Sequence, residues 1–147
     1  RAWWMIAIDT NLLVYAHRED VLWHDAAYAC IKQCAEDRTP WAIPWPCIHE
    51  FLAIVTHPRI YSPPTPTVKA LEQVDSWMES PSLVLLSEAG EYWPHLRALV
   101  LNGRISGPMV HDARVAAVCL QHGVKELWTA DRDFSRLAGL RARNPLL

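Results

Sequence analysis

The sequence predicts an α/β fold with a short, mostly parallel central sheet. Short apolar runs alternate along the chain with longer segments whose apolar residues recur at helical spacing, and proline or polar residues close most of the apolar runs. Strands that alternate with helices form βαβ units, in which helices cover both faces of a parallel sheet. We therefore expect a three-layer α/β/α domain with four to five strands.

Individual elements follow from local patterns. Apolar runs predict strands at 4–8, 41–43, 83–86 and 126–129, with an edge strand at 140–143. Helical spacing and end signals predict helices at 12–17, 24–37, 47–56, 67–79, 91–101 and 108–123, and a helical turn at 134–137. Thr67 is expected to cap its helix, Pro44 and Pro46 to close the second strand, and Gly123 to occupy the C′ position after its helix. Residues 57–66 contain four prolines and are predicted to form a loop.

Composition limits the classes of protein to consider. The 147 residues, 51% of them hydrophobic, suit a single globular domain over 1–147, and no apolar run reaches the roughly 18 residues of a membrane span. A formal net charge of -2 argues against tight, sequence-blind binding to DNA, but not against RNA if a metal supplies positive charge. Four cysteines without metal-ligand spacing predict reduced core thiols in a cytoplasmic protein. Residues 1–4 are interpreted as an extension ahead of a native start at Met5.

Four acids lie where an apolar segment ends or a helix begins: Asp9, Glu50, Asp112 and Asp131. Asp9 follows the first predicted strand and Asp131 the fourth. If these strands are neighbours, both carboxylates emerge at the crevice beyond the carboxyl ends of the sheet, where open parallel sheets bind ligands. Gathered carboxylates repel one another, and a hard cation such as Mg²⁺ relieves that repulsion with oxygen ligands. The pattern favours metal-assisted phosphodiester chemistry.

The same residues carry a family resemblance. Ile8-Asp9-Thr10-Asn11, Glu50 in the third helical segment, His111-Asp112-Ala113 and Thr129-Ala130-Asp131-Arg132-Asp133-Phe134 together resemble the motifs of PIN-domain nucleases. In its size the chain resembles the VapC toxins of bacterial toxin–antitoxin pairs. The resemblance covers nearly the whole chain from Met5 onward.

The resemblance implies a set of roles. Asp9, Glu50, Asp112 and Asp131 match the acidic quartet that holds Mg²⁺, or Mn²⁺ as a substitute. Asp133 matches an assisting acid, and Asn11 and Thr129 match polar positions that hydrogen-bond the acids or the substrate. The implied substrate is single-stranded RNA (tRNA, rRNA or mRNA). The implied partners are a small antitoxin that blocks the site and a second copy of the chain in a homodimer.

Residue chemistry gives a compatible mechanism. A bound metal polarises a phosphoryl oxygen and lowers the pKa of a water that attacks phosphorus. Asp9, Asp112 and Asp131 are the expected direct or water-mediated ligands, whereas Glu50 is open to three roles: orienting the water, acting as base, or completing a second metal site. Substrate contacts are expected from Arg104, Arg114 and Arg132. His111 beside Asp112 and Trp45 ahead of Glu50 are further candidates, Trp45 as a platform for base stacking.

Other functions remain open to test. A haloacid-dehalogenase-type phosphatase is disfavoured. In that family a second Asp, which serves as general acid, stands two residues after the first, and this chain has Asn11 at that position. A PIN nuclease of RNA processing, and a module that binds RNA or an antitoxin without cutting, are the remaining alternatives. EDTA-sensitive cleavage separates a nuclease from a binding module, and a short upstream antitoxin reading frame separates a toxin from a processing enzyme.

Overall fold

The computed structural model describes residues 5–147; the predicted strand start at Trp4 and the proposed extension at 1–4 lie outside the described residues. The strands are β1 (Ile6–Ile8), β2 (Trp41–Pro44), β3 (Leu83–Leu86), β4 (Glu126–Trp128) and β5 (Arg141–Arg143). They form one sheet in the order β3-β2-β1-β4-β5, with every neighbouring pair parallel. The predicted α/β class and the edge strand near residue 140 are confirmed.

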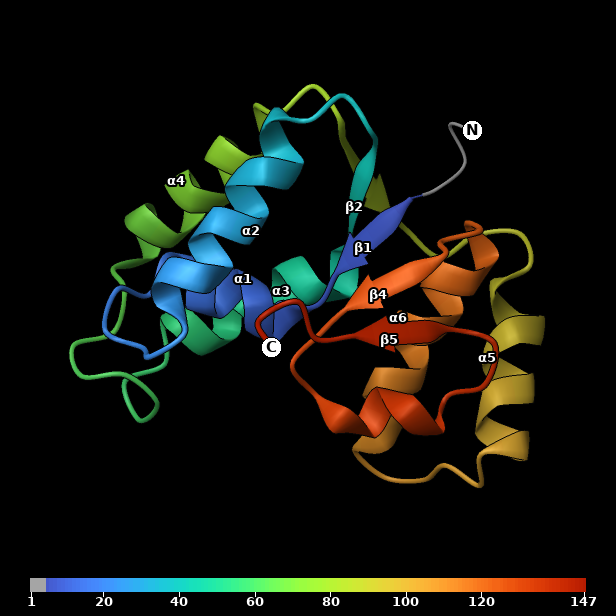
Figure 1. Cartoon of the computed structure of the whole chain (residues 1–147). Coiled ribbons are helices and arrows are strands. Elements are labelled where there is room, and N and C mark those ends of the chain that lie inside the picture. The colour runs from blue at the N-terminus through green and yellow to red at the C-terminus, as the bar shows by residue number, and fades with distance from the viewer. Residues whose placement is uncertain (1–4) are drawn as a thin grey trace.

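Helices cover both faces of this sheet. They are α1 (Thr10–His17), α2 (His24–Glu36), α3 (Trp45–Val55), α4 (Thr67–Met78), α5 (Tyr92–Asn102), α6 (Met109–Gln121) and the short 3₁₀ helix η1 (Arg132–Arg136). Helices α2 and α4 lie on one side of the sheet, and α5 and α6 lie on the other (Figure 1). The arrangement confirms the predicted three-layer α/β/α architecture. Within residues 5–147, no helix has the length and apolar character needed to cross a membrane.

Two predicted helix starts were wrong in detail. Thr67 does not cap α4: Pro66 is the N-cap residue, and its carbonyl oxygen accepts the first helical bond from the backbone N–H of Ala70, at 3.0 Å. Similarly, β2 continues through Pro44, and α3 begins at once at Trp45 with Pro46 in its first turn. The first turn of a helix has no partner for its N–H groups, so a proline there removes nothing that the helix needs.

The end of α6 matches its prediction. Gly123 has a φ of +71°, which glycine adopts without steric strain. Its N–H donates to the carbonyl of Leu120 at 3.1 Å, and the N–H of Val124 donates to the carbonyl of Cys119 at 3.0 Å. This pair of bonds satisfies carbonyls at the helix end and directs the chain into β4.

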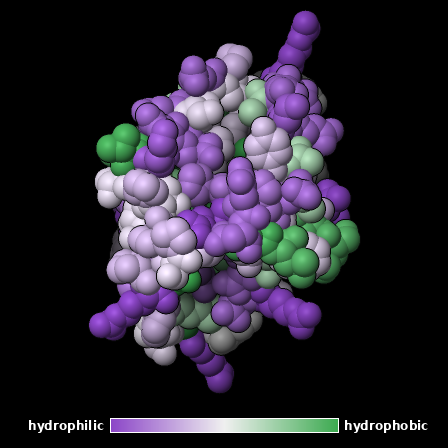
Figure 2. Space-filling model, turned by 90° about the vertical axis from the view of Figure 1, so that its left-hand side faces the viewer, coloured by the Kyte–Doolittle hydropathy of each residue, from purple (hydrophilic) through white to green (hydrophobic). Residues whose placement is uncertain are grey.

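The helices on the α2 and α4 side bury one face each. In α4 the buried residues are Ala70, Val74 and Trp77, at helical spacing, and in α2 they are Ala27 and Ile31. The outward surface on this side is mostly hydrophilic, with apolar residues confined to small patches near its edges (Figure 2). These helices are therefore held by amphipathic packing against the layer beneath them.

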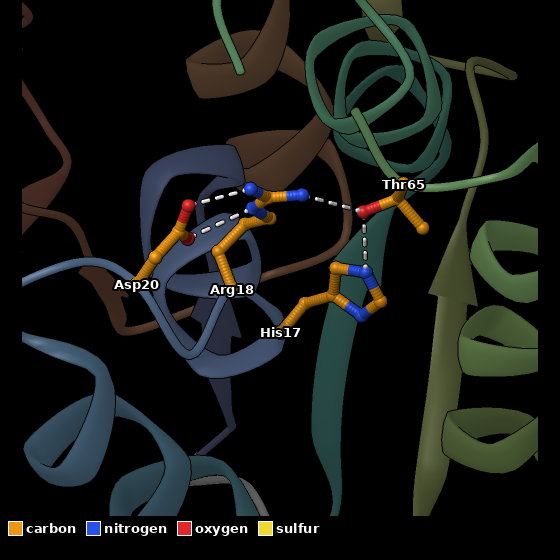
Figure 3. Close-up of polar contacts among 4 residues, drawn as sticks. All are labelled: His17, Arg18, Asp20 and Thr65. Carbon is orange, nitrogen blue, oxygen red and sulfur yellow. Dashed lines mark hydrogen bonds and ion pairs between the residues drawn. The ribbon is translucent and has the colours of Figure 1, made fainter. Parts of the chain in front are cut away.

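The proline-containing loop at 57–66 is fixed by the end of α1. His17 Nε2 and Arg18 Nη1 both contact the hydroxyl oxygen of Thr65, at 3.0 and 3.2 Å, and Arg18 also pairs with Asp20 (Figure 3). The guanidinium carbon of Arg18 lies 4.2 Å from the ring centroid of Tyr61. Because the guanidinium of Arg18 is already engaged by Thr65, Asp20 and Tyr61, we assign it a structural role.

Candidate active site

Two neighbouring strands bring the first and last acids together. Strands β1 and β4 pair with Ile8 opposite Trp128, so Asp9 and the segment from Thr129 to Asp131 leave the sheet side by side. The N–H of Asp9 donates to the carbonyl of Trp128 at 2.9 Å. The two strands are therefore neighbours, as the expected convergence of Asp9 and Asp131 requires. Both acids emerge at the carboxyl end of the sheet.

A hydroxyl links the two strand ends. Thr129 Oγ1 donates to Asp9 Oδ2 at 2.8 Å, and it accepts from the N–H of Asp131 at 3.0 Å and from Asn11 Nδ2 at 3.4 Å. Asn11 Oδ1 accepts in turn from the N–H of Ala130 at 3.1 Å. These contacts fix the orientation of the Asp9 carboxylate and tie the loop of Asp131 to the start of α1.

Asp9 is only 6% exposed. Burial raises the pKa of Asp9; the bond from Thr129 opposes this rise, and the charge of Glu50 adds to it. A further contact comes from the buried Cys47 of α3, whose Sγ lies 3.5 Å from Asp9 Oδ1. Burial also raises the pKa of the Cys47 thiol, so Cys47 contacts Asp9 as a neutral donor.

All four acids of the quartet line one cavity of about 410 Å³. Asp9 and Asp131 enter it from the strand ends, Glu50 from α3 and Asp112 from the first turn of α6. Residues separated by more than a hundred positions in the chain thus face the same space. Such a cavity, with a few convergent polar groups, has the size and character of a small-ligand site.

Within residues 5–147, one group of three acids is especially compact. One carboxylate oxygen each from Asp112, Asp131 and Asp133 lies within 4.8 Å of the others. Asp131 also accepts the N–H of Asp133 at 2.8 Å, which fixes the loop that carries both. Burial, followed by the charges of Asp131, Asp9, Asp133 and Glu50, raises the pKa of Asp112 to about 6. Hard carboxylate oxygens with unrelieved mutual repulsion suit a divalent cation such as Mg²⁺.

The predicted substrate arginines lie in three different settings. Arg114 lines the cavity, but its Nε donates to Glu88 Oε1 at 2.6 Å, so its charge is compensated. Arg132 is exposed next to Asp131 and borders a neighbouring cavity. Arg104 is exposed in the loop between α5 and α6, with a φ of +52°, and does not border the cavity of the acids. Substrate binding by each of these arginines stays a prediction.

The PIN domain family model matches residues 6–140, which include the whole acidic cavity. The chain belongs to the PIN-domain family. Curated relatives of this PIN domain include Ribonuclease VapC43 from Mycobacterium tuberculosis, 32% identical over 142 residues, with 97% of this chain and 96% of the relative covered. Ribonuclease VapC48 from the same organism is 28% identical, covering 93% of this chain and 94% of the relative.

Solved structures with the same fold come from several bacteria. VapBC2 from Rickettsia felis, bound to a DNA fragment from its promoter, matches with a TM-score of 0.71 at 18% identity over 95% of this chain and 98% of that one. VapC20 from Mycobacterium tuberculosis, described as a toxin that cleaves the sarcin-ricin loop, matches with a TM-score of 0.68 at 13% identity over 92% and 95%. At these identities the likeness supports the PIN fold alone.

Two neighbours of the PIN-domain acids, Cys47 and His49, were given another role by sequence reasoning or missed. Cys47 was interpreted only as a core thiol, yet it contacts Asp9. Its spacing of three residues from Glu50 places both on adjacent turns of α3, which was an available signal. His49 lines the cavity and stacks against Trp45, with ring centroids 6.2 Å apart. His111, a predicted substrate contact, also lines the cavity.

Replacing Thr129 should weaken the site through Asp9. We expect Thr129→Val to reduce cleavage of RNA by roughly 10- to 100-fold, the usual cost of losing a group that orients a metal-binding residue. The valine has a similar shape but no hydroxyl to hold Asp9 or accept the N–H of Asp131. Initial rates under identical Mg²⁺ conditions measure the effect. Thr129→Ser keeps the hydroxyl and should retain most activity; equal losses in the two variants would contradict the proposed role of the hydrogen bonds.

Proposed function

We propose that this chain is a metal-dependent endoribonuclease that cleaves single-stranded RNA and acts as the toxin of a toxin–antitoxin pair. The observation that carries the proposal is the meeting of the acidic quartet in one cavity of a PIN domain. Relatives of nearly the same length that are named as VapC ribonucleases support the activity. Solved VapBC assemblies with this fold support a small partner protein.

The residues divide into groups with different chemical tasks. Asp112, Asp131 and Asp133 form the compact oxygen-donor group that would hold Mg²⁺ or Mn²⁺. When bound there, the ion neutralises charge on the phosphate and makes a water more acidic. Asp9, held in place by Thr129, extends this negative surface toward Glu50. Glu50 is exposed on the cavity wall and has room to orient the attacking water or take up its proton.

The remaining assignments follow the same logic. A cavity with this much negative charge attracts cationic side chains, so we infer that the partner protein inhibits the enzyme by placing a basic residue among the acids. A homodimer is proposed from the family resemblance. A role in RNA processing is the second candidate, since the same site serves both; a short antitoxin reading frame beside the gene favours the toxin.

Removal of metal tests the activity directly. We expect the purified chain to cut single-stranded RNA with Mg²⁺ or Mn²⁺, to lose that activity completely in excess EDTA, and to regain it when the metal is restored. Labelled RNA fragments separated by electrophoresis report the cleavage. An Asp9→Asn preparation purified in parallel identifies contaminating nuclease. RNA binding without cleavage, in both Mg²⁺ and Mn²⁺, would favour the binding module as the function. Cleavage that resists EDTA would exclude the proposed mechanism.

A further inference from the structure

A second cavity lies on the far side of Asp131 from the acidic cavity. It has a volume of about 450 Å³, and its lining includes Thr129, Asp131, Arg132, Ser135, Arg143 and Asn144. Asp131 lines both cavities, so the two adjoin at this residue. The acidic cavity is lined by four carboxylates, whereas the second cavity offers two arginines and several neutral hydrogen-bonding groups beside the single side-chain carboxylate of Asp131. The proposed function uses the first cavity and leaves the second without a role.

The charge balance around the second cavity is positive on the side of β5. Arg141 Nε and Arg143 Nη1 lie 3.4 and 3.6 Å from the two carboxylate oxygens of the buried Glu126. Two arginines thus share one carboxylate, which leaves one positive charge in excess. The guanidinium of Arg143 also lies over the ring of Trp128, 5.6 Å from its centroid, and its side chain remains 57% exposed. Arg132, which is exposed and also lines this cavity, adds a second cation.

An RNA strand bound at the acidic cavity needs cationic groups beside it for its other phosphates. The phosphates next to the scissile one cannot all lie against the acidic cluster, because like charges repel. In the acidic cavity the lining arginine, Arg114, is already paired with Glu88. The chain as a whole has a net charge of -2 and offers no general attraction for a polyanion. Local cations adjoining the site must therefore hold the strand.

We propose that the cavity lined by Arg132 and Arg143 binds the nucleotide adjacent to the scissile phosphate, with both arginines contacting the RNA backbone. The inference rests on the proposed ribonuclease function. Arginine suits this task because its planar N–H groups match phosphate oxygens. Ser135 and Asn144 supply neutral hydrogen-bonding groups beside them. The substrate strand then runs from the acidic cavity across Asp131 into the second cavity.

The chain contains a matched control for this proposal. Arg141 and Arg143 lie two residues apart on β5, and each pairs with Glu126, but only Arg143 borders the second cavity. Arg141→Gln and Arg143→Gln therefore each remove one ion pair from the same carboxylate, and Arg143→Gln also removes the contact with Trp128. Loss of the pairing with Glu126 should affect both variants, whereas an effect on RNA binding should appear only for Arg143.

The test is a binding measurement in an Asp9→Asn background with Mg²⁺, using a short fluorescein-labelled single-stranded RNA of mixed sequence. We expect Arg143→Gln and Arg132→Gln each to weaken binding by roughly 3- to 10-fold at moderate salt and to reduce the slope of log K against log salt by about 0.7, the value for one lost phosphate contact on a single strand. Arg141→Gln should change neither quantity. Thermal unfolding should shift for both Arg141→Gln and Arg143→Gln, and at least as far for Arg143→Gln, which also loses its contact with Trp128.

Two outcomes overturn the inference. One is an RNA affinity and salt slope for Arg143→Gln and Arg132→Gln that match those of Arg141→Gln. The other is an equal loss for Arg141→Gln and Arg143→Gln with none for Arg132→Gln, since that pattern reports the pairing with Glu126. If Arg143→Gln fails to fold, Arg132→Gln decides alone, because Arg132 is exposed. Failure of the proposed function is distinguishable, since it appears as absence of RNA cleavage by the unsubstituted chain.

Discussion

Asp9→Asn should reduce RNA cleavage by at least about 100-fold, because loss of a group that only orients a metal site already costs 10- to 100-fold. Asp9 is the most buried acid of the quartet, with Thr129 on one oxygen and Cys47 near the other. Asparagine keeps the shape and one acceptor oxygen, so Thr129 still has a partner. The negative charge that helps to hold a divalent ion is lost.

The folded state should tolerate this change. Burial raises the pKa of Asp9, so the ionised carboxylate is held in an unfavourable environment when no metal is present. The neutral asparagine removes that cost, and the metal-free variant should unfold at the same temperature as the parent or at a higher one. Initial cleavage rates and melting curves in EDTA are the two measurements. A variant that cleaves RNA at the parental rate, with contaminating nuclease excluded, would remove Asp9 from the mechanism.

Much of the fold was predictable because its signals are local. Apolar runs closed by polar residues or proline mark the strands, and Gly123 marks the end of α6. The errors at Thr67 and Pro46 also have a local cause. A threonine or a proline suits more than one position near a helix start, and the choice depends on how the preceding residue directs the chain. The parallel pairing of β1 with β4 joins segments far apart in the sequence. The alternation of strands and helices predicted a parallel sheet, but not which strands are neighbours in it.

The acids of the site were predictable from their positions in the sequence, but which of them lie closest together was not. The sequence resemblance gave Asp133 an assisting role and made Glu50 a full member of the quartet. In the structure Asp133 belongs to the compact trio, because the turn that follows Asp131 brings both carboxylates together. Glu50 lines the same cavity from a separate helix. The spacing of Cys47 from Glu50 indicates that both lie near one face of α3, but how close Cys47 and His49 come to the other acids depends on the direction in which α3 approaches the sheet.

Asp112→Asn should lower the cleavage activity and raise the stability of the metal-free protein. Cleavage is expected to fall by about 100-fold or more, since Asp112 belongs to the compact trio. The folded-state pKa of Asp112 is about 6, above its ordinary value of 3.8. A raised pKa means that the contribution of this group to stability is fully present below about pH 4 and is lost as pH rises through about 6. At neutral pH the variant should therefore be more stable than the parent in EDTA.

The size of that gain is limited by solvent. Asp112 is half-buried, so screening reduces the effect to about 1 kcal/mol at neutral pH, and the difference should vanish near pH 4. Adding Mg²⁺ should reverse the order, because a ligand stabilises the state that binds it and the parent retains the full set of oxygen donors. Asp75→Asn, on the exposed face of α4, is the control. It should change neither the stability of the metal-free protein nor its stabilisation by Mg²⁺. Equal stabilisation of parent and variant by Mg²⁺ would place the ion elsewhere, since a bound cation should offset the burial and the repulsion that together raise the pKa of Asp112.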